Sequence, residues 1–213
     1  MSATETMAYP PVINRQAPVL LIPDVLEPVL RAELIAAHQA ENEASGMHRM
    51  VDGEVKLVPD PSAKIRRDHT IGDGPLANTV MERLANRVLP RIYEAFAYRV
   101  TRLERLKVVA YQAATGGYFR PHRDNTTPDA AHRRFALTLN LNTGEYTGGH
   151  LRFPEYDDTA LYAPPAGGAC VFSCSLLHEA TDVTAGERFA LLTFFYGDAE
   201  AAGRQSAARR ARR

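Results

Sequence analysis

The sequence has no tryptophan, only two cysteines and no long hydrophobic run among its 213 residues. Cys170 and Cys174 cannot make the disulfide framework of a small secreted domain, and at i and i+4 of an extended segment they lie too far apart to bridge. We therefore expect both to be reduced packing residues. The longest apolar run near the start, Val19 to Ile22, is far too short to span a membrane.

An excess of charge is also missing, because 25 basic residues balance 25 acidic ones. The balance is uneven, since the last ten residues, RQSAARRARR, hold five Arg and no acid. We interpret this end as a solvated basic tail and do not expect it to bind nucleic acid or another anionic partner. No basic segment followed by an apolar run marks a signal peptide at the start. We expect a cytoplasmic protein without a membrane span.

Hydrophobic periodicity predicts helices in the first half of the chain. Ala17–Ile22 has the pattern of a short strand, and Asp24 is a candidate N-cap for a helix that ends near Gln39. A second apolar stripe with four-residue spacing predicts a long helix from Asp73 or Gly74 to about Ala97, which Pro90 should kink or split. Between them, the sequence VDGEV at 51–55 predicts a hairpin.

After Val100 the pattern changes to short strands separated by Gly, Pro and Asn. The expected strands are 103–113, 118–122, 134–141, 150–153, 160–162, 169–174, 179–183 and 189–197. Such a pattern, preceded by helices, predicts a mainly β protein with supporting α-helices and a double-stranded β-helix, or jelly roll, as its core. We expect a flexible start (1–16), one domain over 17–198 and a flexible basic tail (199–213). Within the domain, 17–100 would be helical support and 101–198 the jelly-roll core.

The chemistry is concentrated at His122 and Asp124, a His-x-Asp pair that ends the stretch YQAATGGYFRPHRDN. In an extended chain, side chains at i and i+2 point to the same face. Together with His178 further along the chain, they make the 2-His-1-carboxylate set that holds non-haem Fe(II) and leaves positions open for a cosubstrate and O₂. Arg188 follows His178 by ten residues, and its guanidinium can hold a carboxylate bidentately.

From 103 to 198 the sequence resembles the Fe(II)/2-oxoglutarate-dependent oxygenases, in particular the prolyl 4-hydroxylase-like branch. The matching features, in order, are Tyr111, Gly116–Tyr118, His122-x-Asp124, Gly148-Gly149-x-Leu151-x-Phe153, Pro165-x-Gly167, Val171-Phe172, His178-Glu179, Val183 and Gly186-x-Arg188-Phe189.

The resemblance implies that His122, Asp124 and His178 ligate Fe(II), and that Arg188 pairs with the distal carboxylate of the cosubstrate, 2-oxoglutarate. Tyr111 looks like the tyrosine whose hydroxyl helps to hold that carboxylate. Asn140 is a candidate cosubstrate contact, although relatives often have Tyr at this point. The reaction would consume O₂, with ascorbate as a stimulant.

The resemblance further implies hydroxylation of an unactivated C–H bond, with release of succinate and CO₂. Asp124 favours this outcome over halogenation, because halogenating relatives lack the carboxylate. The expected substrate is a prolyl residue in a peptide or protein, and Arg133 and Arg152 are candidate substrate contacts. One alternative is the same chemistry on a small molecule or free amino acid. Another is a catalytically silent metal-binding or interaction module that uses the Arg tail. The sequence gives no oligomeric state.

Overall fold

The computed structural model describes residues 16–51, 54–157 and 159–202. Its helices are α1 (Pro28–Ala40), α2 (Pro75–Arg87), α3 (Leu89–Phe96) and a single 3-10 turn, η1 (Ala113–Thr115). Its first six strands are β1 (Leu20–Ile22), β2 (Glu43–Ala44), β3 (Met47–Val51), β4 (Glu54–Val58), β5 (Lys64–Ile65) and β6 (Arg67–Thr70).

The remaining strands follow α3, as the change of sequence pattern after Val100 predicts. They are β7 (Arg102–Leu103), β8 (Lys107–Gln112), β9 (Tyr118–His122), β10 (Phe135–Asn140), β11 (Thr147–Gly148), β12 (Leu151–Arg152), β13 (Ala169–Ser173), β14 (His178–Ala180), β15 (Val183–Ala185) and β16 (Glu187–Tyr196). A sheet-rich core with helices beside it confirms the predicted fold class.

Two antiparallel sheets build the core. The larger has the order β1-β13-β10-β16-β8-β6-β2, with β7 also paired to β16, and the smaller has the order β12-β14-β9-β5. Two short pairs, β11-β15 and β3-β4, complete the strands. The two core sheets face each other across a cavity that both of them line, which is the double-sheet arrangement of a jelly roll.

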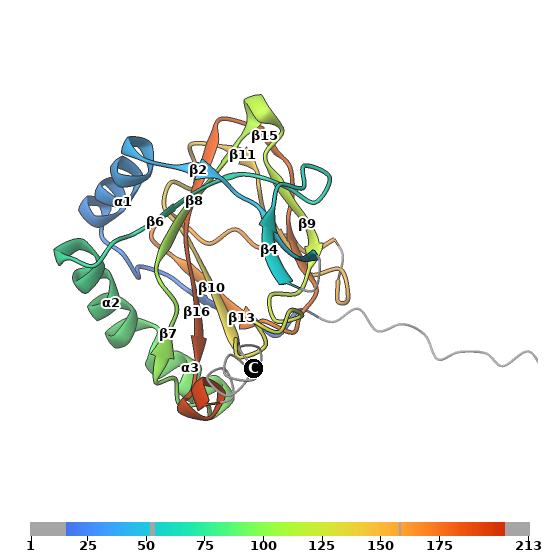
Figure 1. Cartoon of the computed structure of the whole chain (residues 1–213). Coiled ribbons are helices and arrows are strands. Elements are labelled where there is room, and N and C mark those ends of the chain that lie inside the picture. The colour runs from blue at the N-terminus through green and yellow to red at the C-terminus, as the bar shows by residue number, and fades with distance from the viewer. Residues whose placement is uncertain (1–15, 52–53, 158, 203–213) are drawn as a thin grey trace, which may run out of the picture.

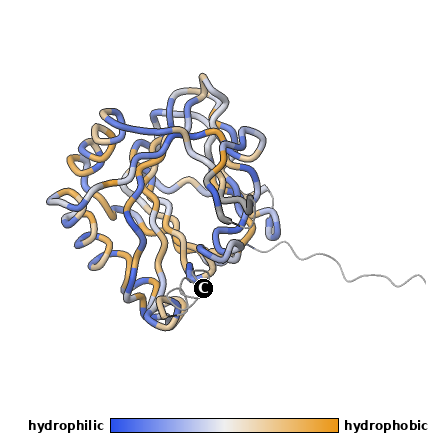
Figure 2. The backbone as a smooth tube through the Cα atoms, viewed as in Figure 1, coloured by the Kyte–Doolittle hydropathy of each residue, from blue (hydrophilic) through white to orange (hydrophobic). Residues whose placement is uncertain are grey.

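The larger sheet separates the helices from the cavity. Side chains that alternate along β8 point to opposite faces, so Val108 and Ala110 pack with the helices while Val109 and Tyr111 join a cluster on the other face. Leu34 of α1 and Ile92 of α3 belong to the first cluster and are fully buried. Figure 1 shows the three helices side by side along this sheet, and Figure 2 shows apolar stretches on the strands and helices that meet there.

The long predicted helix is split in two at Val88, so that α2 ends at Arg87 and α3 begins at Leu89. Pro90 lies in the first turn of α3, where its missing N–H is not needed. The prediction of a kink or split by Pro90 is therefore confirmed.

The predicted start of the first helix is wrong. Asp24 has a positive φ of 53° and does not cap α1, which begins at Pro28 with Glu27 as its N-cap residue. A residue before proline is driven to extended backbone, and Glu27 accordingly has ψ 156°. The helix therefore cannot extend back to Asp24.

Other differences concern the strands and the ends of the chain. Residues 160–162 form no strand, only a single bridge between Tyr162 and Leu151. The 17–100 region is more than helical support, because β1, β2 and β6 belong to the large sheet and β5 to the small one. In the expected tail, residues 199–202 are helical, and Glu200 accepts hydrogen bonds from Tyr98 and Arg134.

Some predictions fall on residues outside the described ranges: most of 1–16, the turn of the 51–55 hairpin and the Arg-rich stretch 204–213. The strands on either side of that turn, β3 and β4, do pair.

Cys170 and Cys174 are buried free thiols, as predicted, and burial raises the pKa of Cys170 to about 12. Within the described residues, none of the helices is long and apolar enough to cross a membrane.

Replacing Leu34 by Ala should lower the free energy of unfolding by about 2–5 kcal/mol, because the change leaves a cavity between α1 and the large sheet. Chemical denaturation measures this loss. Leu21→Ala is the matched control, since Leu21 is 54% exposed and its truncation should change stability by less than about 1 kcal/mol. Equal losses in the two variants would contradict this packing.

Candidate metal centre and cosubstrate site

Two strands of the small sheet bring the predicted metal ligands together. His122 ends β9, Asp124 follows two residues later, and His178 begins β14, which pairs with β9 so that His178 lies opposite His122. The Nε2 atom of His122 lies 3.5 Å from Asp124 Oδ1, and that of His178 lies 3.3 Å from Asp124 Oδ2. The structure thus places all three predicted residues at one point.

The two imidazoles are held with the same nitrogen facing inward. His122 Nδ1 lies 2.8 Å from the carbonyl oxygen of Arg120, and His178 Nδ1 lies 3.0 Å from that of Leu176. A proton on Nδ1 can be donated to each carbonyl, which leaves the Nε2 lone pairs free to bind a metal. Phe119 stacks on His122 at 3.4 Å between ring centroids and fixes the ring plane further.

The electrostatics of the triad suit a cation. Burial lowers the pKa of His178 to about 4, so its imidazole is neutral at physiological pH. Burial by itself would raise the pKa of Asp124, but His178, His122 and Arg133 outweigh it and hold that pKa well below its usual range. The neutral imidazole of His178, the imidazole of His122 and the carboxylate of Asp124 therefore face each other, with ligand atoms all within 4.8 Å of one another. This donor set fits Fe(II).

A second part of the site lies on the large sheet. Arg188 of β16 is directly opposite Tyr111 of β8 in the strand register, and its guanidinium carbon lies 5.3 Å from the centre of the Tyr111 ring. Its Nη2 donates to Asn140 Oδ1 at 2.9 Å. The three predicted cosubstrate residues therefore form one cluster.

Arg188 has room for an anionic ligand. It is 2% exposed, its Nε has no hydrogen-bond partner, and no carboxylate of the described residues forms an ion pair with it. A buried cation without a counter-ion is costly, and a carboxylate bound at this point would relieve the cost. Gly149 keeps space beside the side chain, because a Cβ there would lie 2.8 Å from Arg188 Cδ. The arrangement fits a distal carboxylate of 2-oxoglutarate.

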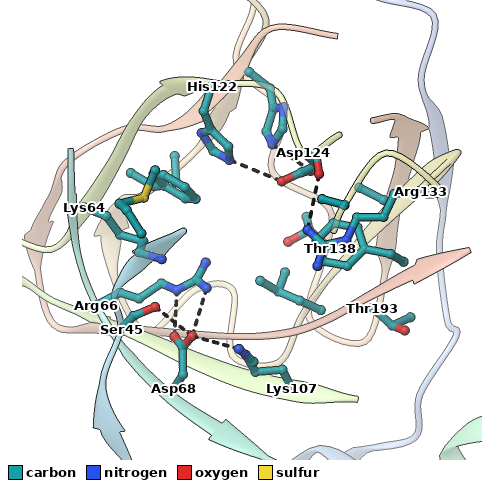
Figure 3. A pocket seen from close by; sticks show the side chains of 18 of the residues that line it. Ser45, Lys64, Arg66, Asp68, Lys107, His122, Asp124, Arg133, Thr138 and Thr193 are labelled. Atoms are coloured by element: carbon teal, nitrogen blue, oxygen red, sulfur yellow. Dashed lines mark hydrogen bonds and ion pairs between the residues drawn. The ribbon is translucent and has the colours of Figure 1, made fainter. Parts of the chain in front are cut away.

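The triad and Arg188 open into the same cavity, which has a volume of about 370 Å³. Figure 3 shows His122 and Asp124 on one side of it and Arg66 and Asp68 on the opposite side, with Lys64 between them. This is the size of a site for a small ligand.

Sequence reasoning missed the Arg66–Asp68 pair on that wall. Arg66 Nε and Nη2 donate to the two carboxylate oxygens of Asp68 at 2.7 and 3.0 Å, and Arg66 Nη1 donates to the Tyr111 hydroxyl at 3.3 Å. Burial would raise the pKa of Asp68, but Arg66 outweighs this and the pKa lies far below its ordinary value. Their i, i+2 spacing on an extended segment was the available signal.

The two predicted substrate contacts differ in position. Arg133 lines the cavity, but its guanidinium is engaged, because Nε and Nη2 donate to the carboxylate of Glu104 at 2.8 Å and Nη1 donates to the Asp124 carbonyl oxygen at 3.2 Å. Arg152 pairs with Glu179 and lies outside the residues that line the cavity. A substrate role for either stays a prediction.

Comparison with known proteins agrees with this geometry. Residues 106–196 match the model of the 2OG-Fe(II) oxygenase superfamily, and this range contains the triad, Arg188, Tyr111 and Asn140. The match covers 91 of the 213 residues. The protein is accordingly a dioxygenase, and the cofactors of the matching superfamily are Fe(II) and 2-oxoglutarate, with O₂ as the oxidant.

Solved structures of low sequence identity share the fold of this oxygenase. A Pseudomonas putida prolyl-4-hydroxylase is 21% identical with a TM-score of 0.62, covering 85% of this chain and 93% of its own. A Trichoplax adhaerens prolyl hydroxylase is 18% identical with a TM-score of 0.66, covering 86% of each chain. A viral collagen prolyl hydroxylase from Paramecium Bursaria Chlorella virus-1 is 16% identical with a TM-score of 0.60, covering 84% and 96%. No curated protein sequence matches.

Replacing Arg188 by Met should raise the KM for 2-oxoglutarate roughly 10- to 100-fold, because hydrogen bonds between a guanidinium and a carboxylate are lost. Steady-state succinate release at varied 2-oxoglutarate measures the change. Arg91→Met is the control, since Arg91 is exposed on α3 and pairs only with Glu94. An unchanged KM in Arg188→Met would show that the distal carboxylate binds elsewhere.

Replacing Asp68 by Asn should lower the free energy of unfolding at pH 7 by about 3–5 kcal/mol, because it leaves the buried Arg66 without its counter-ion. The folded-state pKa of Asp68 is depressed, so its contribution is complete above the ordinary value of 3.8 and is lost as pH falls below it.

Denaturation at several pH values tests both parts of this statement. The difference between wild type and Asp68→Asn should be constant near neutral pH and shrink below pH 4. Asp198→Asn is the control, because the Asp198–Arg102 pair is exposed and should contribute less than about 1 kcal/mol. A difference that grows as pH falls would contradict the assigned sign.

Proposed function

We propose that the protein hydroxylates an unactivated C–H bond of a prolyl residue in a peptide or protein. In the balanced reaction, one oxygen atom of O₂ enters the C–H bond as a hydroxyl group, and the other enters the succinate formed from 2-oxoglutarate as CO₂ leaves. We further propose that a single domain over 17–198 carries this activity and that the enzyme is cytoplasmic.

One observation carries the proposal: the triad shares a cavity with a buried guanidinium that has no counter-ion among the described residues. The triad alone is compatible with a structural metal. Arg188, whose Nε no group of the described residues satisfies, adds a place for the second carboxylate of a keto acid. Asp124 completes the ligand set, which favours hydroxylation over halogenation.

The roles of the side chains follow from their positions. When bound, Fe(II) and 2-oxoglutarate supply the activation of O₂. His122, Asp124 and His178 would hold the metal on one face and leave the other face to the cavity. Arg188 and Asn140 would orient the cosubstrate, with the Tyr111 hydroxyl close by. Apolar groups such as Phe119 and Phe172 beside the triad exclude water.

Support for a prolyl substrate comes from the structures that share the fold. The three described above are prolyl hydroxylases, and the one from Trichoplax adhaerens is in complex with a peptide fragment of hypoxia inducible factor. The cavity in the present chain is bounded by strands from both halves of the sequence. A prolyl residue of a peptide is the substrate class that we propose on this basis.

The first experiment measures succinate release from 2-oxoglutarate with Fe(II) and O₂, with and without a panel of prolyl peptides. Wild type should release succinate, and a subset of prolyl peptides should raise the rate and gain one oxygen atom by mass spectrometry. His178→Ala should lose the activity, because it removes a metal ligand.

His150→Ala serves as the matched control, because His150 lies outside the triad and should leave turnover unchanged. Succinate release that survives in His178→Ala would overturn the metal assignment. Turnover in wild type that alanyl peptides stimulate as strongly as prolyl peptides would overturn the prolyl substrate and leave the oxygenase assignment intact.

A further inference from the structure

Lys64 lines the cavity from the edge strand of the small sheet and has no role in the site described so far. It is the first residue of β5 and pairs with Phe119 of β9 in the strand register. Figure 3 shows its side chain directed into the cavity, toward the space between the triad and Arg66.

The ammonium group of Lys64 is buried and only partly satisfied. The residue is 8% exposed, its Nζ donates to the Gly46 carbonyl oxygen at 2.5 Å, and it lies 4.9 Å from the centre of the Phe119 ring. An ammonium has three N–H donors, so this one carbonyl leaves donors to spare. Among the described residues, no carboxylate forms an ion pair with it.

The carboxylate of Asp68, which acts on Lys64, cannot serve as its counter-ion. Asp68 is already bound by Arg66 on both oxygens, by Lys107 at 3.3 Å and by the Ser45 hydroxyl at 2.8 Å. Arg66 and Lys107 thus already neutralise Asp68, and no ion pair among the described residues joins it to Lys64. Burial, followed by the charge of Arg66, lowers the pKa of Lys64 to about 7. A bound anion would stabilise the charged form of this side chain.

An anion bound at Lys64 would be distinct from the cosubstrate at Arg188, because β5 belongs to the small sheet and β16 to the large one. Lys64 contacts Phe119, which stacks on His122, whereas Arg188 lies beside Asn140 and Tyr111 on the large sheet. The two cations therefore belong to different walls of the cavity. A carboxylate at Lys64 would gain a charge-assisted hydrogen bond and remove an uncompensated buried charge.

We propose that Lys64 binds a carboxylate group of the substrate that is hydroxylated. This inference rests on the proposed function and narrows its substrate class to molecules that carry an acid group close to the oxidised position. The carboxylate has two possible sources, the C-terminus of a molecule that ends in proline and the acidic side chain of a neighbouring residue.

The test uses four acetylated peptides, Gly-Pro with a free C-terminal carboxylate, Gly-Pro amide, Gly-Pro-Asp amide and Gly-Pro-Asn amide. Their dissociation constants are measured by ligand-observed NMR on the full chain loaded with Fe(II) and 2-oxoglutarate under anaerobic conditions. No turnover takes place in this state. Binding is therefore scored separately from hydroxylation, and a failure of the proposed function is distinguishable from a failure of this inference.

Wild type should bind at least one of the two acidic peptides about tenfold or more tightly than the matching neutral peptide. This is the size of effect expected for one hydrogen bond to a charged group. A preference within the Gly-Pro pair identifies a C-terminal carboxylate, and one within the Asp/Asn pair identifies a side chain. Lys64→Met should remove the preference and leave the affinity of the neutral peptides and of 2-oxoglutarate unchanged. Lys64→Gln, which retains a donor toward Gly46, should do the same if the Met variant does not fold.

Arg91→Met, which removes one positive charge from the exposed face of α3, should keep the preference. Three outcomes would overturn the proposal. They are equal or absent binding of acid and neutral peptides by wild type, a preference that persists in both Lys64 variants, and a loss in those variants of 2-oxoglutarate affinity in place of peptide affinity.

Discussion

The antiparallel pairing of β9 with β14 is the constraint on which the site depends. It sets His178 opposite His122, although the two residues are 56 positions apart in the chain, and it leaves Asp124 just beyond the end of β9. Because side-chain direction alternates along a strand, a shift of the pairing by one residue would turn the second imidazole to the other face. The backbone carbonyls of Arg120 and Leu176 then fix the two rings. The register of the sheet therefore determines the positions of the metal ligands.

The large sheet separates an apolar core on one of its faces from the ligand cavity on the other. Its helix-facing side is filled by apolar groups from β8, β10 and β16 together with α1, α2 and α3. Its other side carries Arg188 and Tyr111 into the cavity. Apolar packing on one face stabilises a sheet that can hold a cation at a fixed position on the other. Burial of this unpaired cation is unfavourable, and an anionic ligand that binds it removes that penalty, which strengthens binding.

Cations around the cavity fall into two groups. Arg66 and Arg133 have protein counter-ions, Asp68 and Glu104, and these pairs brace the cavity walls through Tyr111 and the Asp124 carbonyl. Arg188 and Lys64 have none among the described residues, and both are buried. A buried charge needs a partner, so the cations that lack one indicate where ligands bind. On this basis Arg188 marks the cosubstrate end of the cavity, and Lys64 marks the proposed substrate end.

The sequence by itself determined the elements that depend on local pattern and spacing: the strands after Val100, the helix break at Pro90 and the His122-x-Asp124 pair with His178 and Arg188 downstream. These follow from hydrophobic period, proline geometry and the alternation of side chains. Only the tertiary structure decided that Glu104 engages Arg133, that Arg66 reaches Tyr111 and that Lys64 lines the same cavity as the triad. The contacts of Arg133 and Arg66 join residues 29 and 45 positions apart, and strand pairing, which local pattern does not specify, brings such residues together.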